Sequence, residues 1–304
     1  MASFAPVYIE TAQSGRLAEK TRAAAEILKH CRLCPRRCGV DRISGENGIC
    51  RTGKSAKISS FNAHFGEEAP LVGKNGSGTI FFTHCSLMCC FCQNFDISHE
   101  GHGSPVTDEE LAAIMIAIQD EGCHNINLVT PSHVVPQFLS ALEKAIEAGL
   151  RIPIVYNSSG YDRVETLQLL EGVIDIYMPD FKFWDPDVAQ AACEAPDYPA
   201  VAKKALVEMH RQTGDLQIDA DGIARSGLLV RHLVLPQDLA GTRQIMRFIH
   251  DSVSPGTYVN IMSQYRPCGN YRKVAGLERR ITSAEYQNAL EAARKEGITR
   301  LDRK

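Results

Sequence analysis

The sequence of 304 residues predicts an α/β protein built on a partial (β/α)6 barrel of the TIM type, preceded by an N-terminal four-cysteine metal-binding segment. From Thr79 onward, short apolar runs alternate with amphipathic ones, a pattern typical of β/α units around a parallel sheet. Six such units in about 190 residues are too few for a complete eight-stranded barrel. The 11 cysteines form two clusters and three single residues, and the first cluster precedes the predicted barrel.

The individual elements follow from their composition in chain order. A polar, Ala-rich stretch over residues 17–30 predicts a helix. Two capping boxes, Thr107 with Glu110 and Thr282 with Glu285, predict the starts of two further helices. Apolar runs with little alternation predict six buried parallel strands, over residues 79–83, 125–130, 152–156, 175–178, 228–235 and 258–262.

These elements divide the chain into four expected parts. Residues 1–28 form an N-terminal helical segment, and residues 29–57 form the four-cysteine metal-binding segment. Residues 78–266 form the partial barrel, and residues 267–304 form a C-terminal helical extension.

The overall composition excludes several protein classes. With 44% hydrophobic residues, 23% charged residues and a net charge of -3, the chain is neither disordered nor fibrous, and its charge does not suggest nucleic-acid binding. The longest apolar run, residues 111–118, is far shorter than the roughly 20 residues of a spanning helix. The first residues lack the basic and apolar regions of a secretory signal. We therefore expect a cytoplasmic protein, where cysteines serve metal or redox chemistry rather than disulfides.

The second cysteine cluster, HCSLMCCFCQN, directly follows the first predicted barrel strand. Cys85, Cys89 and Cys92 have the spacing C-x3-C-x2-C, which lets three thiolates hold one iron–sulfur cluster and leaves one iron without a protein ligand. An open coordination position is where a substrate binds in catalytic metal sites. A zinc knuckle or a group of buried free thiols is the alternative.

Several motifs resemble those of the radical S-adenosylmethionine superfamily over about residues 30–268. More narrowly, the chain resembles an uncharacterised family related to pyruvate formate-lyase activating enzymes. The motifs are GTIFFTHCSLMCCFCQN, NINLVTPSH, PIVYNSSGYD, DIYMPDFKF, RHLVLP and NIMSQYRP. The resemblance implies a catalytic [4Fe-4S] cluster on Cys85, Cys89 and Cys92 that chelates S-adenosylmethionine. It also implies reductive cleavage of that cofactor to methionine and a 5′-deoxyadenosyl radical, which abstracts a substrate hydrogen.

The resemblance favours activation of a glycyl-radical enzyme. A radical enzyme that modifies a small molecule or a peptide shares every motif, and a non-catalytic iron–sulfur electron-transfer protein is a third alternative. We expect a reductant such as flavodoxin or ferredoxin as a partner, no membrane association and no nucleic-acid partner.

The resemblance also implies where the cofactor is bound. Phe91 packs near the adenine, Thr130 and Ser132 replace a Gly-Gly-Glu run that meets the methionine amino group, and a strand-four Met and Asp help hold a monovalent cation. The complete set of implied cofactor-binding residues is Phe91, Thr130, Ser132, Asn157, Ser158, Met178, Asp180, Lys182 and His232. His232 is equally compatible with a core position, because it and Arg231 point to opposite faces of a regular strand.

We expect roles other than metal binding for the remaining cysteines. Cys90, Cys123 and Cys193 are interpreted as small buried hydrophobic residues. Cys268, in a Pro-Cys-Gly turn, is a weak candidate for a hydrogen-atom donor. His84 is expected to have a structural role.

The first cluster, Cys31, Cys34, Cys38 and Cys50, has the spacing C-x2-C-x3-C-x11-C. Four thiols suffice for a zinc ion or an auxiliary iron–sulfur cluster, and spacing does not choose between them. Reduced free thiols are the alternative.

The surrounding segment carries a local net charge of +6. This charge has three interpretations: a docking site for an acidic electron donor, a phosphate site, or a solvated face. An RNA-binding module is a separate hypothesis. The charge comes from Lys29, Arg32, Arg36, Arg37, Arg42, Arg51, Lys54 and Lys57 against Asp41 and Glu46.

Overall fold

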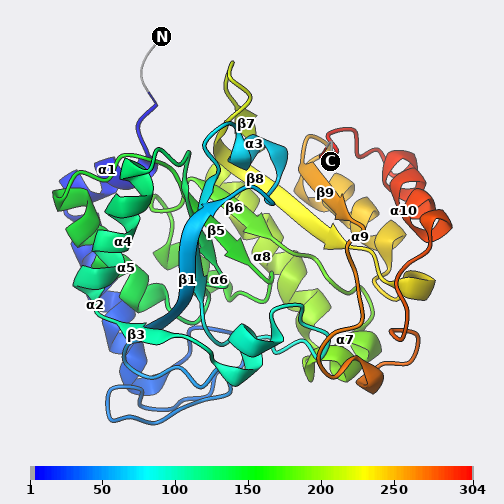
Figure 1. Ribbon diagram of the computed structural model, residues 1–304, viewed down its shortest axis with the longest axis horizontal. Coiled ribbons are helices and arrows are strands. Elements are labelled where there is room, and N and C mark those ends of the chain that lie inside the picture. Colours follow the sequence, from blue (N-terminus) through cyan, green and yellow to red (C-terminus); the bar gives the residue numbers. More distant parts are fainter. Residues whose placement is uncertain (1–3, 303–304) are drawn as a thin grey trace.

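A computed structural model describes residues 4–302 of the chain and is shown in Figure 1. Its centre is a sheet in which six strands run parallel, each hydrogen-bonded to the next. This confirms the predicted α/β class with a mostly parallel central sheet. The parallel strands are, in spatial order, β2 (Ser77–Phe82), β4 (Ile126–Val129), β5 (Ile154–Ser158), β6 (Ile176–Pro179), β8 (Ala224–Leu233) and β9 (Tyr258–Met262).

Helices connect successive parallel strands. They are α4 (Asp108–Asp120), α5 (Val135–Glu147), α6 (Val164–Leu169), α7 (Pro186–Cys193), α8 (Tyr198–Thr213) and α9 (Thr242–Phe248), with α10 (Ser283–Lys295) after the last strand. Both predicted capping boxes are formed, at the starts of α4 and α10. Shorter turns are η2 (Asp96–Glu100), η3 (Pro236–Asp238), η4 (Ile249–Val253) and η5 (Tyr271–Lys273).

Three antiparallel strands extend the sheet beyond the sequence prediction. β1 (Ala56–His64) pairs with β2, β3 (Ser104–Val106) pairs with β1, and β7 (Gln217–Ile218) pairs with β8. β1 was not predicted, because its mostly polar C-terminal half gives no buried apolar pattern. Phe61 in this half is 44% exposed. A short helix, α3 (Ala69–Val72), follows β1.

The two faces of the parallel sheet have different cores. The outer face packs against the helices through residues such as Ile126, Tyr156 and Val230. The inner face has its own apolar cluster, which includes Leu71 of α3, Val155 of β5 and others. Because successive strand side chains alternate between faces, this arrangement assigns every strand residue to one side or the other.

The N-terminal helices lie against the outside of the sheet. They are α1 (Val7–Gln13), α2 (Arg16–Ile27) and the turn η1 (Leu28–His30); α2 and η1 match the helix predicted over residues 17–30, whereas α1 was not predicted. The Val7 N–H donates to Asp175 Oδ1 (2.8 Å), the Tyr8 hydroxyl donates to the Ile152 carbonyl (2.8 Å), and Thr11 Oγ1 donates to the Gly172 carbonyl (2.7 Å). These bonds attach the first helix to segments more than 140 residues later.

No helix among residues 4–302 combines the length and apolarity needed to cross a membrane. The division of the chain into residues 1–28, 29–57, 78–266 and 267–304 stays a prediction.

Arg42 attaches the four-cysteine segment to the barrel. Its side chain is only 1% exposed. Its guanidinium donates twice to the Gly53 carbonyl (2.9 and 2.8 Å), once to the His133 carbonyl (2.9 Å) and once to Cys31 Sγ (3.9 Å). A buried charge is tolerated only when its donors are satisfied in this way.

We predict that Arg42→Met lowers the free energy of unfolding by about 3 kcal/mol, because buried carbonyls lose charged donors. Urea denaturation measures the change. Arg22→Met, a change of the same chemistry at an exposed position on α2, should alter stability by no more than about 0.5 kcal/mol. Equal effects of the two substitutions would contradict the anchoring role.

Candidate active site

A cavity of about 170 Å³ lies where the parallel strands end. Cys85, Cys89 and Cys92 line one side of it, on the loop that follows β2. The other sides are the carboxyl ends of β4, β5, β6 and β8, which contribute Thr130, Asn157, Ser158, Ser159, Asp180, Lys182 and Arg231. Thus the three cysteines and most of the strand-end residues predicted from the sequence do share one site.

The loop over residues 84–94, here called the cysteine loop, has an unusual backbone. His84 and Met88 adopt left-handed conformations, with φ of 68° and 59°, and Thr130 across the cavity has φ of 63°. Non-glycine residues rarely adopt this conformation, because it costs free energy. Such strained backbone is found most often at functional sites. The His84 N–H donates to the Ile97 carbonyl (2.9 Å), which fixes the start of the loop.

The three thiols differ in their surroundings. Burial, and secondarily the neighbouring Cys89, raises the pKa of Cys85 to about 12, and burial also raises the pKa of Cys92. A hydrogen bond from the Cys193 thiol lowers the pKa of Cys89 despite its burial. The sequence predicted only a packing role for Cys193, but its Sγ lies 3.4 Å from Cys89 Sγ.

The donor set of the cysteine loop fits an iron–sulfur cluster. Among residues 4–302, no three His, Cys, Asp or Glu side chains are grouped in a way that would hold a single metal ion. A four-iron cluster distributes its thiolates over separate irons, so three thiols around one cavity meet its requirement without meeting at a point.

The floor of the cavity is a buried charge network. Arg231 Nε donates to Asp180 Oδ1 (2.8 Å), and Arg231 Nη2 donates to Asn157 Oδ1 (2.6 Å). Lys182 Nζ forms an ion pair with the other oxygen of Asp180. Burial opposes ionisation of Asp180, but Arg231 and Lys182 outweigh it and hold its pKa below the usual value. Lys182 and Arg231 therefore share the Asp180 carboxylate at the floor of this cavity, and Arg231 Nη1 also pairs with Glu67 Oε2 (3.9 Å).

A second buried network positions the ends of β4 and β5. Asp162 accepts hydrogen bonds from Ser132 Oγ (2.6 Å), Ser158 Oγ (2.6 Å) and the Tyr156 hydroxyl (3.1 Å). Burial raises the pKa of Asp162, and the three hydroxyl donors oppose that increase. Asp162 was not predicted as a site residue, although it ends the motif PIVYNSSGYD, in which a carboxylate follows two serines.

Four residues expected at the cofactor do not line the cavity. Ser132 donates to Asp162 instead. Phe91 packs edge-to-face against Phe183 and Tyr265, with ring centroids 5.9 and 5.8 Å apart. Met178 belongs to the inner apolar cluster. His232 faces the outside of β8, where its ring nitrogens contact the Phe181 carbonyl (2.8 Å) and Thr242 Oγ1 (3.0 Å). Strand alternation explains His232, because its neighbour Arg231 takes the inward position.

The four cysteines of the N-terminal segment are neighbours. Burial, reinforced by Cys50, Cys31 and Cys38, raises the pKa of Cys34 to about 12. The Ile49 N–H donates to Cys38 Sγ (3.5 Å). Among the described side chains, no group of three or more His, Cys, Asp or Glu residues is placed to hold a single metal ion, and zinc or an auxiliary iron–sulfur cluster on these four cysteines stays a prediction.

Arg36 links this segment to the cysteine loop. Its guanidinium donates to the carbonyls of Ser86 (3.1 Å) and Leu87 (3.1 Å), and to the carbonyl of Cys193 (2.6 Å) at the end of α7. Arg36 and Arg42 therefore serve internal contacts, which corrects the expectation that all eight basic residues form one surface. Neutralising Arg36 would disturb the fold as well as the surface.

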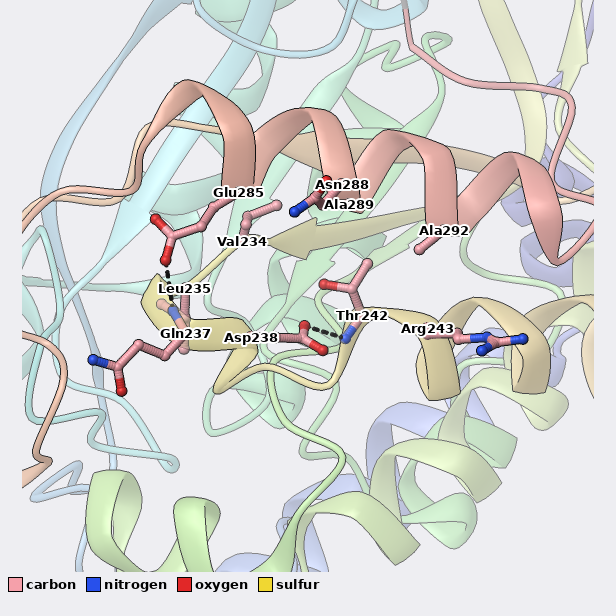
Figure 2. A pocket seen from close by; sticks show the side chains of 10 residues that line it. All are labelled: Val234, Leu235, Gln237, Asp238, Thr242, Arg243, Glu285, Asn288, Ala289 and Ala292. Atoms are coloured by element: carbon pink, nitrogen blue, oxygen red, sulfur yellow. Dashed lines mark hydrogen bonds between the residues drawn. The ribbon is translucent and has the colours of Figure 1, made fainter.

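A second cavity, of about 340 Å³, lies between η3, α9 and α10 and is shown in Figure 2. Its acidic side chains bind nearby backbone: Glu285 accepts from the Gln237 N–H (2.8 Å), and Asp238 accepts from the Thr242 N–H (2.9 Å). None of the cysteine-loop thiols lines it. These side chains stabilise the turn after β8.

Comparison with known proteins identifies a family and a shared fold. Residues 79–215 match the radical SAM superfamily. The chain is 34% identical over 284 residues to the uncharacterised protein MJ0674 of Methanocaldococcus jannaschii, covering 91% of this chain and 78% of that protein. The crystal structure of a radical SAM methyltransferase from Sphaerobacter thermophilus superposes with a TM-score of 0.52 at 15% identity, covering 75% of this chain and 67% of that one. At this identity the superposition shows a shared fold alone.

Gly160 packs closely against the backbone of Asp180 at the cavity floor. It has φ of 73°, and a Cβ at this position would lie 2.2 Å from the Asp180 carbonyl oxygen. We predict that Gly160→Ala lowers stability by about 2–4 kcal/mol, through left-handed strain together with overpacking.

Gly222→Ala is the matched control for that substitution. Gly222 has φ of 81°, and a Cβ added there would meet no other atom within 4 Å, so it isolates the strain of about 1–2 kcal/mol. Thermal unfolding compares the two variants. If Gly160→Ala costs no more than the control, the close approach has no energetic importance.

Proposed function

The chain belongs to the radical SAM superfamily, and on that premise we propose that it cleaves S-adenosylmethionine reductively at a [4Fe-4S] cluster held by Cys85, Cys89 and Cys92. The observation that carries the proposal is the convergence of three thiols and a buried charge network on one cavity. When bound, such a cluster supplies an electron to the sulfonium, and the resulting 5′-deoxyadenosyl radical takes a hydrogen atom from the substrate.

The protein's own side chains bind and orient the cofactor. Lys182 and Arg231 offer positive charge to the methionyl carboxylate, while Asp180 holds both cations in place. The Asn157 amide oxygen accepts from Arg231, so its NH2 group is the donor available to a ligand. Ser158 and the Thr130 backbone complete the wall, and the Asp162 network fixes the strand end that carries Ser158.

The substrate class has two candidates. Activation of a glycyl-radical enzyme follows from the motif resemblance, and modification of a small molecule or a peptide uses the same cavity. The comparisons lend no support to the activating-enzyme subtype specifically, so hydrogen abstraction is the common proposal. An electron-transfer protein without cofactor cleavage is the alternative from a different class. A flavodoxin or ferredoxin would supply the electron in each case.

We also propose that Cys31, Cys34, Cys38 and Cys50 hold a second metal centre. Their mutual proximity and the N–H···S bond to Cys38 support it. Zinc and an auxiliary iron–sulfur cluster are both held by four thiolates, and we propose the cluster as the alternative to test.

Cofactor cleavage gives the direct test. We expect anaerobically reconstituted, reduced protein to form 5′-deoxyadenosine and methionine from S-adenosylmethionine. Cys89→Ala should abolish formation, because one iron loses its ligand. Cys90→Ala is the matched control, since Cys90 is also buried and adjacent but does not line the cavity. No product from wild-type protein with a complete, reducible cluster would refute the enzyme and favour electron transfer.

Metal analysis tests the second centre. We expect reconstituted wild-type protein to contain iron and sulfide beyond one [4Fe-4S] cluster, and Cys34→Ala to lose that excess while keeping the first cluster. Cys123→Ala, a buried thiol outside both clusters, controls for thiol loss. Equal metal content in Cys34→Ala and wild-type protein would exclude the second centre.

A further inference from the structure

Cys193 is a buried thiol directly beside a proposed cluster ligand. It is the last residue of α7, is 3% exposed and does not line the cavity. Its Sγ donates a hydrogen bond to Cys89 Sγ at 3.4 Å, although 104 residues separate them in sequence. The three loop cysteines already account for the ligands, so this fourth sulfur has no role in the proposed coordination.

Backbone contacts fix the distance between the two sulfurs. The Cys90 N–H donates to the Ala192 carbonyl (2.8 Å), which joins the residue after Cys89 to the residue before Cys193. Arg36 donates both to the Cys193 carbonyl (2.6 Å) and to the Leu87 carbonyl (3.1 Å). These bonds hold the backbones that carry the two sulfurs next to each other.

The chemistry of the Cys193–Cys89 pair determines which of the two sulfurs carries the proton. A cysteine binds iron as the thiolate, so in the loaded protein Cys89 is the acceptor and Cys193 keeps its S–H. Reduction of an iron–sulfur cluster adds negative charge, part of which resides on the ligand sulfurs, and hydrogen bonds to those sulfurs raise the reduction potential. Lys182 also acts on Cys89 through its charge.

We propose that Cys193 is a positioning residue that raises the reduction potential of the cluster through its S–H···S bond to Cys89. The inference rests on the proposed function, since it requires the cluster. The bond adds to the stabilisation of the charge on Cys89 when the cluster is reduced.

The test is a potentiometric titration of the reconstituted, full-length protein followed by electron paramagnetic resonance. We expect Cys193→Ala to lower the ratio of reduced to oxidised cluster at a fixed potential about tenfold, which is 59 mV for a one-electron couple. Cys193→Ser keeps a donor and should recover most of that shift. Cys123→Ala, a buried thiol elsewhere, should leave the potential unchanged.

The possible outcomes distinguish failure of this inference from failure of the proposed function. An unchanged potential in Cys193→Ala with full iron content would overturn the hydrogen-bonding role and leave the proposed function intact. Loss of iron in both Cys193 variants, with Cys123→Ala fully loaded, would make Cys193 a ligand and overturn the inference as stated. A wild-type protein that binds no cluster would overturn the proposed function, and this inference with it.

Discussion

A single guanidinium, that of Arg36, joins three parts of the chain that meet at the cavity. It binds carbonyls of the cysteine loop and of the end of α7, and it comes from the four-cysteine segment. A planar group with five donors suits this task, because it satisfies several carbonyls at once and cannot lose its charge. The strained backbone at His84 and Met88 persists because contacts of this kind over-determine it.

The parallel sheet separates support from chemistry by alternation along each strand. In β8 the outward His232 fastens the sheet to neighbouring segments, while the inward Arg231 reaches Asp180 and Asn157 on two other strands. The barrel end that lacks these charges is filled instead by an apolar cluster. The polar site is therefore confined to the carboxyl ends, where the loops and the cysteines also meet.

The sequence predicted the parallel strands, the capping boxes and the convergence of cysteines and strand-end residues, because these follow from periodicity, local hydrogen bonding and parallel connection. It missed β1, whose exposed half lacks an apolar pattern, and Asp162, whose partner Ser132 lies 30 residues earlier in the chain. The resemblance implies that Phe91 and Met178 lie at the cofactor, which stays a prediction; in the structure both pack against aromatic or aliphatic side chains. Contacts between distant segments, such as Cys193 with Cys89, have no local signature.

The attachment of α1 has a consequence for synthesis on the ribosome. Val7, Tyr8 and Thr11 bind partners near residues 152, 172 and 175, so the first helix cannot take its final place until more than half of the chain has emerged. Contacts of such large sequence separation slow folding, because the intervening loop must close first. The apolar surface of the N-terminal helices is then exposed to solvent or to chaperones during elongation, and the strands in the middle of the chain determine when it is covered.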